Sequence, residues 1–475
     1  LAEEPRVQAS LLITLGDAHS GLGLRRRAEA LHRRALEHRI ELLGDDHPET
    51  AQSRDRLGNT LREIARFDEA EEELRRALAT REARLSEDDP ALAETRNNLG
   101  LLLLERGQFE QAEPLLRRAL EVRLARLGLD HDDTAASQTN LGILLKDTRR
   151  FDEASALFEA VLENRLRRLG EDHPSVANSV HMLATLRYDQ GDLETAEGLF
   201  ERAIRIRRRV LPAKHPLLAP SLNNMASLLH DQWRLEEAAR YYREALDISE
   251  ERPGGHVMGY AISLNNYGSL LEDLGRYGEA EQHYRRSAAL RKEIQGEDSR
   301  SYRRMISSLG RLATRAGQLE LAEKLLVESE SWYREHVGPD EPDRIRTLER
   351  LAVLRRAQGR AAESATLLRS ALERAERTYD AGHRILAELS SELAMTLAAS
   401  ADPTPCHEAV SAARAVTAQK PGSEITRGRV ELAAGLCHRA LGRDSEADQS
   451  LALAEELLEP LLGGGNHWVR AAKAG

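Results

Sequence analysis

Residues 91–132 read ALAETRNNLGLLLLERGQFEQAEPLLRRALEVRLARLGLDHD and contain two apolar stretches with helical spacing. In the first stretch, Leu99 and Leu103 lie on one side of a helix. Gly107 interrupts that helix, and a second apolar stripe begins at Phe109. The segment therefore predicts a helical hairpin, which cannot bury its apolar faces alone and needs neighbours.

The same pattern recurs along most of the chain at a spacing of 42 residues. The residue that opens the second helix is aromatic or aliphatic at Phe67, Phe109, Phe151, Leu193, Leu235, Tyr277 and Leu319. Three residues later the chain repeats an alanine at Ala28, Ala70, Ala112, Ala154, Ala196, Ala238, Ala280 and Ala322. A Leu-Gly or Leu-Ala pair in the first helix keeps the same spacing. Such a period is typical of a helical repeat array.

This period predicts an all-α fold, a right-handed α-solenoid (superhelix) of about eleven helix-turn-helix units. We expect nine clear 42-residue repeats within residues 1–384, the first of them at 7–48. Residues 385–462 predict a degenerate repeat followed by a terminal capping hairpin, and residues 463–475 a flexible tail. A Pro-Gly-Gly sequence in the sixth repeat predicts a flexible joint at 252–259.

The composition suits amphipathic helices and argues against several classes of protein. Hydrophobic residues make up 41% and charged residues 31%, so each helix can have one buried and one solvated face. A net charge of −11 argues against binding of nucleic acid by the chain as a whole. No apolar run approaches the roughly 20 residues that cross a bilayer, so we expect no membrane insertion.

The chain contains two cysteines, Cys406 and Cys437. Two cysteines in a chain of this length do not suggest a disulfide framework, and we therefore expect a reducing, cytoplasmic compartment. The sequence starts at Leu1 and not at Met, which predicts a fragment or processed piece of a longer protein.

Two stretches carry a resemblance to a known family. RNNLGLLLLERGQFEQAE at 96–113 and LNNYGSLLEDLGRYGEAE at 264–281 resemble the tetratricopeptide repeat, in the 42-residue version found in kinesin light chain and its bacterial relatives. The resemblance is clearest over residues 7–384. It implies a generic interaction scaffold and does not name a partner. The opening PRVQASLLITLGDAHSGLG also resembles repeats that follow bacterial serine/threonine kinase domains.

The resemblance places the residue before each Leu-Gly or Leu-Ala pair on a concave channel. Four asparagines occupy this position: Asn98, Asn140, Asn224 and Asn266. An asparagine amide offers both a donor and an acceptor, so a ladder of them could hold the backbone of an extended peptide. The alternative is that each asparagine braces the neighbouring helix.

Three arginines are predicted on the C-terminal part of the same channel. Arg304 and Arg346 lie one turn before the asparagine position, and Arg350 occupies it. Together they could receive a carboxylate or a phosphate by bidentate hydrogen bonds. The alternative is that they are solvated surface charges.

Other polar clusters have structural interpretations. Arginines near the ends of second helices, such as Arg123, Arg165 and Arg207, favour the negative end of the helix dipole. One histidine per repeat falls in a loop, at His47, His131, His173 and His215, and these lie too far apart to share a metal ion. The adjacent pairs Cys406-His407 and Cys437-His438 lack the spacing of zinc ligands.

No nucleophile elbow, phosphate-binding loop, zinc-protease motif or dinucleotide fingerprint occurs in the sequence. We therefore predict no catalytic residue, no metal, no cofactor and no enzymatic activity. The sequence favours a scaffold that binds a protein or peptide segment in the channel. The alternative is a sensory or regulatory arm of a larger bacterial signalling enzyme, a kinase or a nucleotide-driven switch, whose catalytic domain lies outside this chain.

Overall fold

A computed structural model describes residues 5–250, 257–419, 424–462 and 466–474. All regular secondary structure within these ranges is helical, so the all-α prediction is confirmed. The chain divides into an N-terminal unit, 1–229 with 240–260, and a C-terminal unit, 230–239 with 261–475. The predicted joint at 252–259 lies largely outside the described residues.

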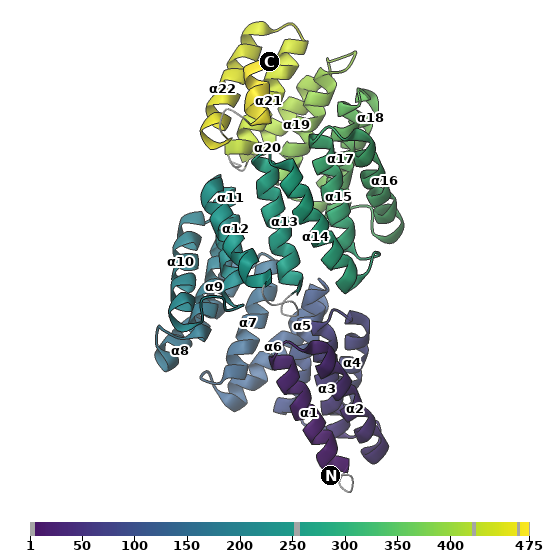
Figure 1. Cartoon of the computed structure of the whole chain (residues 1–475), viewed down its shortest axis with the longest axis vertical. Coiled ribbons are helices and arrows are strands. Elements are labelled where there is room, and N and C mark those ends of the chain that lie inside the picture. Colours follow the sequence, from purple (N-terminus) through teal and green to yellow (C-terminus); the bar gives the residue numbers. More distant parts are fainter. Residues whose placement is uncertain (1–4, 251–256, 420–423, 463–465, 475) are drawn as a thin grey trace. The chain divides into compact units, whose positions relative to one another are not determined.

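Consecutive helices pair into hairpins (Figure 1), and we call the odd-numbered helices first helices and the even-numbered ones second helices. The helices up to the sixth hairpin are α1 (Pro5–Gly21), α2 (Arg25–Leu43), α3 (Pro48–Glu63), α4 (Phe67–Arg84), α5 (Pro90–Glu105), α6 (Phe109–Leu127), α7 (Asp132–Asp147), α8 (Phe151–Leu169), α9 (Pro174–Gln190), α10 (Leu193–Val210), α11 (Leu218–Asp231) and α12 (Leu235–Glu250). The remaining helices are α13 (Val257–Asp273), α14 (Tyr277–Gln295), α15 (Arg300–Arg315), α16 (Leu319–His336), α17 (Pro342–Ala357), α18 (Ala361–Thr378), α19 (Arg384–Ala398), α20 (Cys406–Gln419), α21 (Glu424–Ala440), α22 (Asp444–Leu462) and α23 (His467–Ala474).

First helices of neighbouring repeats contact one another within each unit. In the N-terminal unit α1 contacts α3, α3 contacts α5 and α5 contacts α7, and in the C-terminal unit the same holds for α15, α17, α19 and α21. Each second helix also contacts the first helix that follows it, as in α4–α5 and α16–α17. The first helices therefore form a continuous layer in each unit, which we call the first-helix face.

The loop histidines begin the first helices. His47, His131, His173 and His383 each accept a hydrogen bond at Nδ1 from the backbone N–H two residues later, at 3.1–3.3 Å. Asp89 does the same for α5 with its carboxylate, at 2.8 Å. These side chains satisfy backbone donors that the first turn of a helix leaves unpaired. The histidines are N-caps, which explains their regular spacing.

The glycine of the Leu-Gly pair marks where the two helices of a hairpin approach most closely. A Cβ atom at Gly58 would lie 2.7 Å from Leu74 Cγ, and one at Gly142 would lie 2.5 Å from the Phe158 ring. Because real Cβ atoms do not approach so closely, the helices would have to separate to accept any larger residue. The regular spacing of these glycines thus reflects close packing in the hairpins that carry them.

A buried or half-buried arginine links each of the second helices α2, α4, α6, α8 and α10 to the next first helix in the N-terminal unit. The guanidinium donates to a backbone carbonyl ten residues later and to a hydroxyl fourteen residues later. Arg123 Nη1, for example, lies 3.1 Å from the Asp133 carbonyl oxygen and 2.8 Å from Ser137 Oγ. We call this contact the arginine clamp. Five arginines donate to the hydroxyl in this way, and all but the last also donate to the carbonyl: Arg39, Arg81, Arg123, Arg165 and Arg207.

The clamp corrects the interpretation of these arginines as helix-dipole partners on the surface. Arg123 and Arg207 are only 6% and 2% exposed. Burial lowers the pKa of Arg207 to about 10, because desolvation disfavours the charged guanidinium. The neutral acceptors of the next repeat, Ser137 and Ser221, compensate for this burial only by hydrogen bonding.

Two further expectations about the C-terminal region are wrong. Cys406 and Cys437 form a disulfide between α20 and α21, with their Cα atoms 5.8 Å apart. The two antiparallel helices bring together cysteines that are 31 residues apart in sequence. Residues 467–474 of the expected flexible tail form α23, which buries Val469 and Ala472 against α21 and α22.

Among the described residues, no helix combines the length and the apolar character needed to cross a bilayer.

Candidate functional site: the first-helix faces

The asparagines of the N-terminal unit form a ladder of hydrogen bonds between repeats. Asn98 Nδ2 donates to both carboxylate oxygens of Asp55, each at 3.3 Å, and Asn140 Nδ2 donates to Asn97 Oδ1 at 3.1 Å. Asn224 Nδ2 lies 3.5 Å from His181 Nε2. All three partners belong to the preceding repeat, so these amides do brace neighbouring first helices, as the alternative interpretation expects.

The ladder remains partly accessible from the first-helix face. Asn98, Asn140 and Asn224 are half-buried rather than buried. Asn266, in the C-terminal unit, accepts a hydrogen bond at Oδ1 from Asn265 Nδ2 at 3.1 Å. The four asparagines therefore divide between the two units, three in the first and one in the second.

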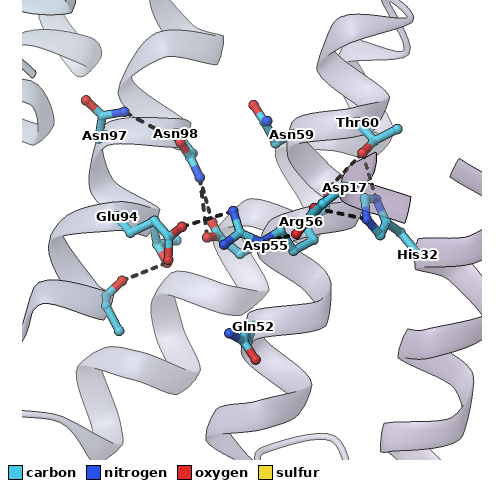
Figure 2. Close-up of polar contacts among 12 residues, drawn as sticks. Asp17, His32, Gln52, Asp55, Arg56, Asn59, Thr60, Glu94, Asn97 and Asn98 are labelled. Atoms are coloured by element: carbon cyan, nitrogen blue, oxygen red, sulfur yellow. Dashed lines mark hydrogen bonds and ion pairs between the residues drawn. The ribbon is translucent and has the colours of Figure 1, made fainter. Parts of the chain in front are cut away.

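A row of alternating charges crosses the first three repeats beside the ladder (Figure 2). Arg56 lies between Asp17 and Glu94, at 3.7 Å from the Asp17 carboxylate and 3.1 Å from that of Glu94. Asp17 and Glu94 have side chains that are 48% and 28% exposed, so they reach the surface. Beneath them, Arg81 lies 3.5 Å from the buried Asp55. Acids and bases nearly balance in this cluster.

Asp55 is the most perturbed acid of this cluster. Only 1% of the residue is exposed. Burial and the nearby Glu94 carboxylate together raise the pKa of Asp55 to about 6, although Arg81 and the Asn98 amide oppose the shift. Protonation of Asp55 near neutral pH would thus change the charge of the first-helix face.

The three predicted arginines of the C-terminal unit lie in different environments. Arg346 pairs with Glu349 at 2.9 Å and Glu388 at 2.7 Å, so its charge is compensated. Arg350 donates from Nη1 to Ser307 Oγ at 2.8 Å and has no carboxylate within 4.0 Å among the described residues. Arg304 is exposed, and no ion pair of its side chain occurs in the described part of the chain. The sequence does not distinguish these three environments.

Buried carboxylates carry the interior charge of the C-terminal unit. Glu272 lies 2.9 Å from Arg311 and 3.1 Å from Arg315, and Glu392 lies 2.7 Å from Arg356 and 3.0 Å from Arg429. Both glutamates are at least 94% buried. In the described ranges no group of three or more His, Cys, Asp or Glu side chains is arranged to hold a metal ion.

Models of the tetratricopeptide repeat match residues 7–83, 66–125, 91–167, 133–209, 175–251 and 259–335, and a second model of the same repeat matches 344–385. These matches cover well over half of the chain. The chain belongs to the tetratricopeptide repeat family. Tetratricopeptide repeats generally serve as scaffolds for protein–protein interaction. No curated protein sequence matches the chain.

Several solved structures resemble this chain. The apo form of RapI is 13% identical and has a TM-score of 0.55, with 78% of this chain and 99% of that chain covered. BtubC (BKLC) from P. vanneervenii is 23% identical, covers 48% of this chain and 91% of its own, and has a TM-score of 0.40. A putative kinesin light chain repeat protein from Podosopora anserina is 24% identical, with 43% and 97% covered and a TM-score of 0.37. RapI supports the fold alone.

The arginine clamp is the feature of the tetratricopeptide repeats that sequence reasoning missed. Its donors and its hydroxyl acceptors both recur every 42 residues, as in Arg81 and Arg123 or Thr95 and Ser137. A charged residue that recurs within an apolar helical stripe is unusual, because an isolated charge is costly to bury. An arginine and a hydroxyl residue that both recur every 42 residues are thus the sequence signal from which the clamp could have been predicted.

Proposed function

We propose that the chain is a non-enzymatic scaffold that binds an extended protein or peptide segment on its first-helix faces. The observation that supports this proposal is the half-buried ladder of amides in the N-terminal unit. Asn140 donates to Asn97, but within the described residues its Oδ1 accepts no hydrogen bond. An amide oxygen held in place by its own donor group is suited to accept a backbone N–H from a bound chain.

The exposed acids beside the ladder add charge specificity. Asp17 and Glu94 offer carboxylate oxygens at the surface, although both are near Arg56. A segment with basic and polar side chains would complement this part of the face, because exposed carboxylates attract cations over several ångströms. Binding would then combine backbone hydrogen bonds with a small number of ionic contacts.

Site-specific photo-crosslinking tests the proposal directly. Ala136 is exposed and lies on α7 one turn before Asn140, so a photoreactive phenylalanine there samples the first-helix face. Glu163, exposed on the second helix α8, is the matched control position. We expect proteins from the source cell to be captured from position 136, and to be competed by the unlabelled chain.

A quadruple variant extends this test to the ladder. Replacement of Asn98, Asn140, Asn224 and Asn266 by alanine should abolish the capture from position 136. A variant with alanine at Glu72, Glu121, Glu163 and Glu201, four exposed second-helix residues, should capture normally. Capture from position 163 alone, or equal capture by both variants, would overturn the assignment of the first-helix face.

The absence of enzymatic activity and of nucleic-acid binding remains a prediction, as does a role as an arm of a signalling enzyme. The expectation of a cytoplasmic location rests on the repeat class. Because Cys406 and Cys437 form a disulfide, these cysteines no longer support the expectation of a reducing compartment.

A further inference from the structure

The arginine clamp breaks down at two successive junctions of the C-terminal unit. Arg291 on α14 occupies the clamp position, but the residue fourteen places later is Met305, which offers no hydroxyl. At the next junction the clamp position holds Tyr333 in place of arginine. The hydroxyl that a clamp would use there, Thr347 Oγ1, instead lies 2.9 Å from Ser307 Oγ. Both junctions therefore contain polar groups without their usual partners.

Arg291 is a buried cation with little compensation. It is 3% exposed, and its only hydrogen bond among the described residues joins Nε to Ser287 Oγ at 3.4 Å. Burial and the charge of the nearby Arg304 together lower the pKa of Arg291 to about 10. A guanidinium in this state gains strongly from any anion that reaches its terminal nitrogens.

Tyr333 supplies an unpaired donor close to the same arginines. The residue is fully buried, and its hydroxyl has no hydrogen-bond partner in the described part of the chain. Tyr333 holds the clamp position whose acceptor, Thr347, contacts Ser307 Oγ at 2.9 Å, and Ser307 Oγ in turn accepts a hydrogen bond from Arg350 Nη1 at 2.8 Å. Burial raises the pKa of Tyr333, and the charges of Arg304 and Arg350 oppose this shift. The acids nearby are Asp343 and Glu341, and Glu341 pairs with Arg300 at 3.0 Å.

Positive charge thus accumulates at one place on the C-terminal unit. Arg291, Arg304 and Arg350 lie on consecutive repeats and have no carboxylate within 4.0 Å in the described ranges. Arg311 and Arg346, their neighbours, are neutralised by Glu272 and by Glu349 with Glu388. An unpaired buried hydroxyl and three guanidinium groups that have no carboxylate partner in the described ranges form a donor set without an anion.

We propose that Arg291, Arg304, Arg350 and the Tyr333 hydroxyl bind a doubly charged oxyanion of the phosphate class. A phosphate monoester carries close to two negative charges and three acceptor oxygens, and so satisfies more of these donors than one carboxylate could. The further inference that this oxyanion is the phosphorylated side chain of a bound peptide rests on the proposed scaffold function. The oxyanion site itself does not depend on that function.

Isothermal titration with inorganic phosphate, at an ionic strength held constant with chloride, tests the site. We expect saturable binding by the full chain, and binding about tenfold weaker in Arg304→Gln, which loses a charge-assisted hydrogen bond. Tyr333→Phe removes only the unpaired hydroxyl. It should leave the melting temperature of the phosphate-free protein unchanged or raised, and weaken phosphate binding at least about threefold.

Matched controls separate a specific site from general positive charge. Arg369→Gln removes an equal charge at an exposed residue of α18 that forms no ion pair in the described ranges, so phosphate binding should stay within about twofold of the parent value. Absence of phosphate binding by the parent would overturn the proposal. Equal losses of phosphate binding in Arg304→Gln and Arg369→Gln, with no loss in Tyr333→Phe, would also overturn it.

The source of the oxyanion is tested with a synthetic polar peptide that contains one phosphoserine. Binding of this peptide more tightly than inorganic phosphate, together with no binding of its unphosphorylated form, supports a peptide-borne phosphate. Equal affinity for the phosphopeptide and inorganic phosphate overturns that source and leaves a free phosphate compound as the ligand. Crosslinking from Ala136 in the N-terminal unit is a separate readout, so failure here does not decide the scaffold function.

Discussion

The two units use the same repeat but compensate some of their buried charges in different ways. In the N-terminal unit, buried arginines such as Arg123 are held by neutral carbonyl and hydroxyl oxygens of the next repeat. In the C-terminal unit, buried glutamates such as Glu392 are held by two arginines. Where the clamp is lost, Arg291 remains buried without either form of compensation. The repeat thus tolerates variation in its linking contacts, and a binding site can arise where a linking contact is lost.

The sequence provides a readout that separates the two units. All three tryptophans, Trp233, Trp332 and Trp468, belong to the C-terminal unit. Tryptophan fluorescence therefore follows unfolding of that unit, whereas far-ultraviolet circular dichroism follows the helices of both. The predictions below use the two signals together.

The largest effect is expected for Glu392→Gln in the C-terminal unit. The change leaves Arg356 and Arg429 without their shared buried carboxylate, which typically costs about 3–5 kcal/mol. The fluorescence midpoint in urea should fall strongly, since Arg429 also stacks over the ring of Trp468 at 4.5 Å. Glu373→Gln, at an exposed residue of α18, is the control. An unchanged midpoint would contradict the view that buried pairs hold this unit together.

Removal of the disulfide by Cys437→Ser should have the next largest effect. The bond closes a segment of 31 residues, and loss of such a cross-link costs about 3 kcal/mol by its effect on the unfolded chain. Reduction of the parent with dithiothreitol should lower the fluorescence midpoint by a similar amount. If the reductant changes the midpoint of the parent and of Cys437→Ser equally, the effect does not come from this bond.

Substitution of a clamp arginine in the N-terminal unit should lower the free energy of unfolding by less than substitution of Glu392. Arg123→Met leaves Ser137 and the Asp133 carbonyl without a donor but also removes a costly buried charge, so we expect a net loss of about 2 kcal/mol. The part of the circular dichroism transition that tryptophan fluorescence does not follow should shift to lower urea concentration, whereas the fluorescence midpoint should stay unchanged. A simultaneous shift of both signals would show that the two units unfold together.

The smallest effect is a change in pH dependence at Asp55. Its pKa of about 6 in the folded chain is above the ordinary value of 3.8, so the folded state binds the proton more tightly. The stabilisation by this proton is complete below pH 3.8 and is lost as pH rises through 6. Asp55→Asn should therefore reduce the fall in stability between pH 5 and 7 by about 1 kcal/mol. Urea titrations of both proteins at the two pH values measure this difference.

The fold could be predicted from the sequence because the equivalents of Leu99, Phe109 and Ala112 recur every 42 residues, and these residues define both helices of each hairpin. The contacts between repeats could not be predicted from the sequence, because they depend on which side chains meet across helices. The sequence assigned Asn98 and Asn140 to first helices, as observed, but their bonds to Asp55 and Asn97 required the structure.

The C-terminal region shows the same limit. The disulfide went unrecognised because Cys406 and Cys437 are distant in sequence and follow no repeat spacing. Likewise, the sequence grouped Arg304, Arg346 and Arg350 by position alone. Their ion pairs separate them, since only Arg346 has carboxylate partners among the described residues.

The arginine clamp also bears on how such a chain can change its length. Donor and acceptor lie fourteen residues apart, and both recur every 42 residues, so a cassette of 42 residues cut at any point carries one complete set of linking groups. Duplication or deletion of one cassette within residues 49–216 would join each new pair of repeats through the same contact. Recombination could therefore lengthen or shorten this part of the array without a new junction having to be invented.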